Sequence, residues 1–213
     1  MRTSWSNDPE FVFDIPTPGA AVLSLAEIKT ACRIELVDDD PNDPDTIARN
    51  AELQSHEAYA RSYCEAYVGQ VFSPTLFRML SPFPAKDGKI YLRKYPVTLV
   101  GTLRIMDLTT GIYSTKIVNT DYIACLVGTE PYLAPSSTQN FFPMGQTLPS
   151  RQDAIEVIFT AGYPAGKLPA RFIDAVRVLV VHRFENPSNI EKIPDAVHRL
   201  LGLSKLRRKG NTW

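Results

Sequence analysis

The chain has 213 residues, of which 44% are hydrophobic and 22% are charged, which is the composition of a globular protein rather than a disordered one. Its 23 basic and 23 acidic residues give a formal net charge of zero, which argues against a protein that coats nucleic acid through bulk charge. The three cysteines include no CxxC pair, which excludes a disulfide framework and fits a reducing compartment.

The balanced total conceals a strong charge asymmetry along the chain. Residues 1–69 carry 5 basic and 13 acidic residues, residues 70–166 carry 8 and 6, and residues 167–213 carry 10 and 4. A subunit with an acidic front and a basic back can attract copies of itself head to tail, in the type of contact that closes into a ring. A surface with unevenly scattered charge gives the same counts, so both readings stay open at this point.

The first 69 residues predict an arm followed by two helices. Prolines and a glycine exclude a long helix from residues 1–22, so we expect an extended N-terminal arm there. Ser24 and Glu27 have the spacing of a capping box, which predicts a helix near 25–34. A second helix is expected near 45–68, with Gly69 as its C-terminal residue.

Residues 70–166 show the short period of β-strands. Runs rich in Val, Ile, Tyr, Phe and Thr alternate with turn residues, which predicts strands at 75–80, 89–93, 98–107, 113–118, 122–126 and 154–160. Residues 131–150 contain no charged residue and four prolines or glycines from Pro135 onward, so we expect a long loop there. Long ordered loops are usually functional, which makes Tyr132, Phe141 and Phe142 candidates for an intersubunit or tail-facing loop.

Helices return near 169–185 and 194–203, the first with a broad apolar stripe that includes Phe172, Val176 and Leu179. Neither helical pair can bury its stripe alone. The sequence therefore predicts an α+β fold with a four-helix bundle-like domain formed by 23–69 and 167–203. Residues 70–166 are expected to be an inserted small antiparallel β-sandwich or barrel, and 204–213 a basic C-terminal tail.

No motif for a cofactor, a metal or catalysis is complete. The segment from Gly162 to Lys167 lacks the glycine spacing and the Ser/Thr of a phosphate loop. The acidic loop that contains Asp38, Asp39, Asp40 and Asp43 lacks the Gly and Glu of a calcium loop, although a weak or intersubunit cation site is an alternative to a solvated loop. His56 and Cys64 share a helix face, but two ligands do not make a metal site. We expect no enzyme activity, no cofactor and no resident metal.

The C-terminal tail combines basic residues with Leu206 and Trp213, and Trp is frequent in protein interfaces. We take it as the partner-binding segment, with phosphate contacts and a solubilising end as alternatives. The candidate residues are Lys205, Leu206, Arg207, Arg208, Lys209 and Trp213.

No stretch reaches the ~20 apolar residues of a spanning helix, so no membrane partner is expected.

Several segments, in this order, resemble the head–tail connector, or adaptor, proteins of long-tailed bacteriophages and related gene-transfer particles. They are Leu23-Ser-Leu-Ala-Glu-Ile-Lys29 with Arg33-Ile34 and the Asp-rich loop, Tyr67-Val-Gly69, Ile155-Glu-Val-Ile-Phe-Thr-Ala-Gly-Tyr163 with Leu168-Pro169, Phe184-Glu-Asn186, and Ile193-Pro194 through Leu200-Leu201 with the basic tail. Together they span nearly the whole chain.

The resemblance implies a non-enzymatic virion protein at the head–tail junction, assembled in the host cytoplasm. Usually twelve copies form a ring under the portal protein, a downstream neck or tail-completion protein binds the other face, and DNA passes through without sequence-specific binding. Carried over, it implies that the tail contacts the portal and that the acidic loop faces the channel.

Two other functional classes stay open on the sequence. One is a DNA-binding protein that uses the basic last helix and tail, with an affinity that falls steeply with salt. The other is a glycan- or surface-binding module that uses the aromatic residues of the β region: Tyr91, Tyr95, Tyr132, Phe141 and Phe142.

Overall fold

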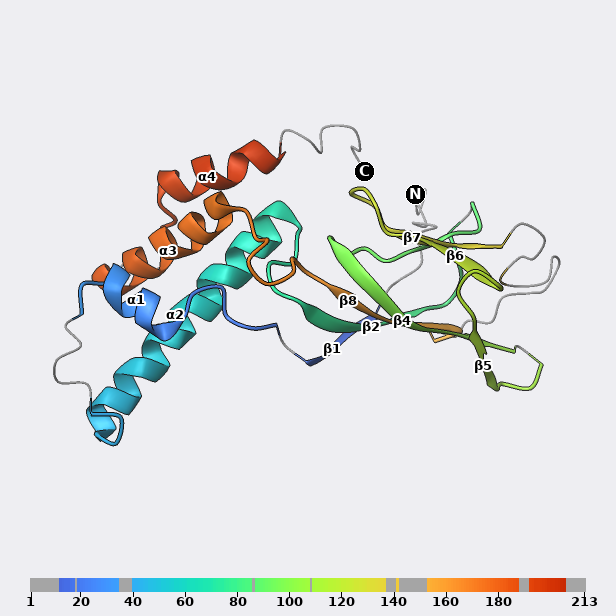
Figure 1. Ribbon diagram of the computed structural model, residues 1–213, viewed down its shortest axis with the longest axis horizontal. Helices are drawn as coiled ribbons and strands as arrows, with labels where there is room; N and C mark the ends of the chain where they lie inside the picture. The colour runs from blue at the N-terminus through green and yellow to red at the C-terminus, as the bar shows by residue number, and fades with distance from the viewer. Residues whose placement is uncertain are drawn as a thin grey trace, which may run out of the picture. The chain divides into compact units, whose positions relative to one another are not determined.

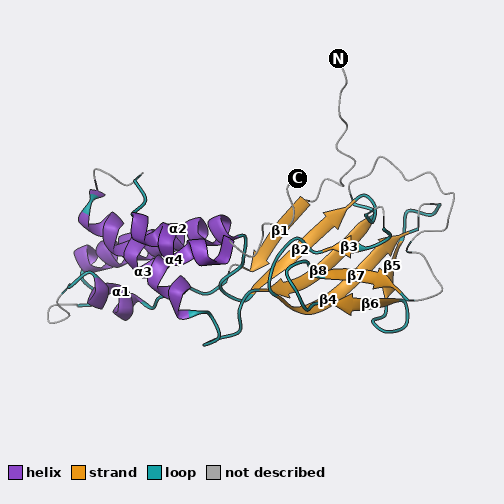
Figure 2. Cartoon of the chain, turned by 90° about the horizontal axis from the view of Figure 1, so that it is seen from above, coloured by secondary structure: helices purple, strands orange, loops and turns teal. Residues whose placement is uncertain are grey.

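The computed structural model describes residues 12–17, 19–34, 40–85, 87–107, 109–136, 141, 153–187 and 192–205. The chain divides into two compact units, and each is described by itself. One unit comprises Ala20–Ser73 and Pro164–Trp213 and contains the helices; the other comprises Met1–Gly19 and Pro74–Tyr163 and contains the strands (Figures 1 and 2).

Four helices form the helical unit: α1 (Leu25–Ala31), α2 (Pro44–Val68), α3 (Ala170–Glu185) and α4 (Asp195–Lys205). The capping box at the start of α1 is confirmed, because the Glu27 N–H donates to the Ser24 hydroxyl and the Ser24 N–H donates to the Glu27 carboxylate. Gly69 ends α2 in the left-handed region at φ 66°, as its position predicts. The first helix ends at Ala31 rather than residue 34, since Arg33 has φ 56° and cannot continue a right-handed helix.

The core of this unit lies around α3, which packs against each of the other three helices. The predicted stripe is buried at Phe172, Val176 and Leu179, and α4 contributes Val197 and Leu201. α1 has 7 residues whereas α2 has 25, and a regular four-helix bundle is not confirmed. The broader α+β class is confirmed.

The strand unit contains two antiparallel sheets (Figure 2). The five-stranded sheet has the order β1-β2-β8-β4-β5, with bounds Val12–Thr17, Thr75–Ser81, Ile155–Ala161, Val97–Met106 and Tyr113–Lys116. The three-stranded sheet has the order β3-β7-β6, with bounds Ile90–Tyr91, Tyr132–Pro135 and Tyr122–Cys125. Alternate residues of β2 are buried, and the Phe77 and Phe159 rings, directly opposite each other on β2 and β8, stack with centroids 5.7 Å apart.

Two expectations for this unit were wrong. Residues 12–17 of the expected arm form the edge strand β1, which pairs antiparallel with β2. Pro16 obscured this strand in the sequence, although an edge strand tolerates a residue without an N–H and the register shifts between Asp14 and Thr17. The expected loop 131–150 begins with a strand, β7, which has only four residues and ends in Pro135.

Candidate assembly surfaces

The predicted tail contact lies at and beyond the end of α4. This helix continues through Lys205, two residues further than expected. Leu206, Arg207, Arg208, Lys209 and Trp213 lie outside the described residues. Lys205, the first of the candidate tail residues, is therefore the last residue of α4.

The helical unit combines an acidic pair of helices with a basic pair. In the described residues, the segments that contain α1 and α2 (20–34 and 40–69) hold seven acidic and four basic side chains. The segments that contain α3 and α4 (164–187 and 192–205) hold seven basic and three acidic side chains. The asymmetry seen along the sequence is thus present within one folded unit, where it gives opposite net charge to the two helix pairs.

The described part of the acidic loop is organised around the start of α2. The Asp40 carboxylate accepts the Asn42 N–H at 2.9 Å. The Asp43 carboxylate accepts the Thr46 N–H at 2.9 Å, and this backbone hydrogen bond lowers the pKa of Asp43. Asp43 is therefore the N-cap of α2, a structural role that the sequence analysis did not assign to it. Asp38 and Asp39 lie outside the described residues.

Tyr132 and Tyr91 lie opposite each other on one face of the three-stranded sheet, with ring centroids 5.8 Å apart. The Lys89 ammonium lies 4.8 Å from the Tyr132 ring, and the Arg93 guanidinium lies 5.9 Å from the Tyr91 ring. The Tyr91 hydroxyl donates to Asp87 at 2.8 Å, which raises the pKa of Tyr91. Each ring thus has one cation of the same chain near one of its faces. Tyr132 belongs to a strand and not to a loop, Phe141 is half-buried, and Phe142 is outside the described residues.

A buried carboxylate on the five-stranded sheet was missed by the sequence analysis. Glu156 on β8 is 2% exposed, accepts from the Arg78 Nε at 2.6 Å and forms an ion pair with Arg104. Arg78 comes from β2 and Arg104 from β4, the two strands that flank β8. A lone Glu inside the apolar run Ile155–Ala161 was the available signal, since a carboxylate buried in a sheet needs cationic neighbours.

The surroundings of His56 and Cys64 do not favour metal binding. Arg183 of α3 donates from Nε to the Nδ1 of His56 at 3.5 Å, and its guanidinium lies 3.8 Å from the Tyr59 ring. Burial raises the pKa of the Cys64 thiol to about 12, which disfavours the thiolate that a metal requires. Among the described residues, no group of three His, Cys, Asp or Glu side chains could hold a metal ion.

The contacts of His56 predict that stability falls in mild acid. Burial lowers the pKa of His56, the Arg183 charge lowers it further, and Glu52 acts in the opposite direction. A folded-state pKa below the unfolded value of about 6.5 means that the unfolded chain binds the proton first. His56 thus contributes stability that is fully present above pH 6.5 and is lost as the pH falls through its folded pKa. Denaturant unfolding between pH 5 and 7.5 should show this loss, and H56Q should show a smaller slope; an equal slope in both proteins would contradict the assignment.

No helix among the described residues is long and apolar enough to cross a membrane. No family description matches the sequence. No curated protein matches it either.

Solved structures do match the fold over nearly the whole chain. A chain in a structure described as "Neck of empty GTA particle computed with C6 symmetry" is 21% identical, with a TM-score of 0.67 over 91% of this chain and 94% of that one. A chain in "Virion of native gene transfer agent (GTA) particle" is 21% identical, with a TM-score of 0.66 over 90% and 93%. A chain in "Neck of native GTA particle computed with C12 symmetry" is 19% identical, with a TM-score of 0.61 over 90% and 94%. The resemblance to connector proteins of gene-transfer particles is therefore confirmed at the level of the fold.

Proposed function

We propose that this protein is a structural subunit of a virion neck, an adaptor whose copies form a ring between head and tail. The fold match carries the proposal. The match covers about nine-tenths of this chain and therefore includes parts of both units. The matched chains belong to neck structures that were computed with cyclic symmetry. A structural role of this kind requires no catalytic group.

The charge distribution of the helical unit supports a cyclic assembly. A ring uses heterologous contacts, in which one surface of a copy meets a different surface of the next copy. The acidic α1–α2 pair and the basic α3–α4 pair offer two such surfaces of opposite charge. Complementary potentials favour this head-to-tail register over the like-charged alternatives.

The finer parts of the proposal concern partners. The C-terminal segment from Lys205 to Trp213 docks on the portal protein at the capsid vertex, because it combines cations with a terminal Trp, a frequent interface anchor. A downstream neck or tail-completion protein binds the opposite face of the ring. DNA passes through the ring without base-specific contacts, and the acidic loop at Asp38–Asp40 lines the channel, where it repels phosphates. The protein acts in the virion and assembles in the host cytoplasm.

Electron microscopy of the purified chain with and without portal protein tests the proposal. We expect closed rings, twelve-fold when portal is present, attached to one face of the portal. Rings without portal contact would remove the docking role and keep the ring. A chain that stays monomeric with portal, or that occupies another position in complete particles, would overturn the neck assignment.

A further inference from the structure

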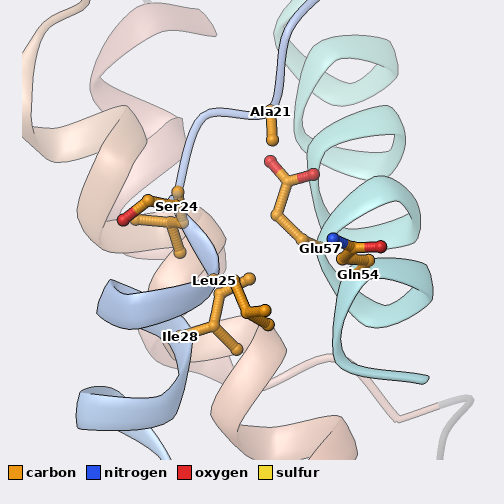
Figure 3. Close-up of a pocket in the computed structure, with 7 residues that line it drawn as sticks. Ala21, Ser24, Leu25, Ile28, Gln54 and Glu57 are labelled. Atoms are coloured by element: carbon orange, nitrogen blue, oxygen red, sulfur yellow. The ribbon is translucent and has the colours of Figure 1, made fainter. Parts of the chain in front are cut away.

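A hollow of about 220 Å³ lies between the start of α1 and the middle of α2 (Figure 3). Most of its lining is aliphatic, and the first and last lining residues before and in α1, Ala21 and Ile28, are both apolar. The residues around it are Ala21, Leu23, Ser24, Leu25, Ile28, Gln54 and Glu57. All the residues that line the hollow belong to the helical unit.

The polar group in this hollow is a buried carboxylate. Glu57 is 3% exposed, and its side chain extends from α2 toward Ala21 (Figure 3). Its Oε1 accepts the Val22 N–H at 2.7 Å. Among the described residues, no hydrogen bond or ion pair reaches its second oxygen, Oε2. An ionised carboxylate can accept about four hydrogen bonds and is costly to bury with so few partners.

An aliphatic hollow with a carboxylate in its wall fits a particular ligand chemistry. The methylene groups of a lysine or arginine side chain pack against apolar walls while the charged head reaches an acceptor. A charge-assisted hydrogen bond to Oε2 would satisfy Glu57 and bury the ligand's stem. We propose that this hollow receives a lysine or arginine side chain from the next copy of the chain in the ring.

The occupant is a second copy of the chain, because the basic α3–α4 pair of one copy is complementary in charge to the acidic α1–α2 pair of another, where the hollow lies. The segments that contain α3 and α4 carry seven basic side chains against three acidic ones, and Lys167, Lys192 and Arg199 are exposed in and beside these two helices. A ring places one surface of each copy against a different surface of its neighbour, so every hollow has a potential donor. This inference rests on the proposed ring and adds to it a specific lateral contact.

The test uses the full-length chain mixed with purified portal, with mass photometry as the readout of copies bound per portal. Glu57→Gln keeps an oxygen that accepts the Val22 N–H and removes the charge. We expect the affinity between neighbouring copies to fall roughly 30-fold or more, because the partner cation loses its counter-charge on burial. Portals with intermediate numbers of bound copies should then appear with Glu57→Gln. The unaltered chain should instead give mainly portals with no bound copy and portals with a complete ring.

Two further variants control for folding and for charge. Glu52→Gln removes a carboxylate from the same helix at a position with a 67% exposed side chain, and should fill portals like the unaltered chain. Gln54→Arg, at the exposed rim of the hollow, supplies a cation from the same chain. It should lower the affinity between neighbouring copies, which can be measured even if Glu57→Gln fails to fold. If Gln54→Arg gave the same distribution of copies per portal as the unaltered chain, the proposed lateral contact would be overturned. Failure of the unaltered chain to form rings, with or without portal, would instead overturn the proposed function.

Discussion

Deletion of residues 206–213 should abolish the joining of portal-bearing heads to tails, and should leave the free energy of unfolding within about 0.5 kcal/mol of the intact chain. The two effects separate because α4 ends at Lys205 and its buried residues, Val197 and Leu201, lie before the cut. The deletion removes three of the four tail cations and Trp213, which are the proposed contacts to portal. In vitro complementation with tail-less or connector-less particles measures joining, and denaturant unfolding followed by circular dichroism measures stability.

Two sets of substitutions distinguish the contribution of the basic residues of this segment from that of Trp213. Replacing Arg207, Arg208 and Lys209 together by Gln removes charge and keeps length, whereas Trp213→Ala removes only the aromatic anchor. Interface anchors carry about 2 kcal/mol or more, so Trp213→Ala should weaken portal binding by roughly 30-fold. Normal joining by the 206–213 deletion would remove the segment as the docking element. Loss of duplex DNA affinity in place of portal affinity would favour the DNA-binding alternative.

The parts of the fold with strong local signals were predictable from the sequence. The Ser24–Glu27 capping box and Gly69 at the end of α2 act through neighbouring backbone groups, so the residues themselves specify them. The apolar stripe of α3 was predictable because a 16-residue helix repeats its period several times. The interior strands β2 and β8 were also identified, since each is a short run rich in apolar and β-branched residues between turn residues.

The features that were missed depend on residues far apart in the chain. β1 is defined by its pairing with β2, whose partner residues lie 59 to 68 positions later, and its own sequence contains Pro16. Glu156 is buried because Arg78 and Arg104 lie on the neighbouring strands. Glu57 is buried because the segment before α1 covers it and donates the Val22 N–H, 35 positions away. The local pattern shows Glu156 in a strand and Glu57 on a helix, but it does not show which distant residues lie against them.

Phe172→Ala should lower the free energy of unfolding by about 3–5 kcal/mol, the largest loss we expect from a single side chain of this unit. Phe172 is fully buried on α3, and its ring stacks on Phe72 with centroids 4.8 Å apart and an interplanar angle of 17°. The substitution leaves a cavity in the centre of the helical unit, next to residues that contact all three other helices. Denaturant unfolding monitored at 222 nm reports this unit, since it contains all four helices.

The neighbouring position supplies the matched control. Ile173 follows Phe172 on the same helix turn and is only half-buried, so Ile173→Ala should cost less than half as much. A double-mutant cycle of Phe172→Leu with Phe72→Leu isolates the ring contact, which we expect to contribute about 0.5–1.5 kcal/mol beyond burial. Equal losses at 172 and 173 would mean that α3 presents a different face to its neighbours.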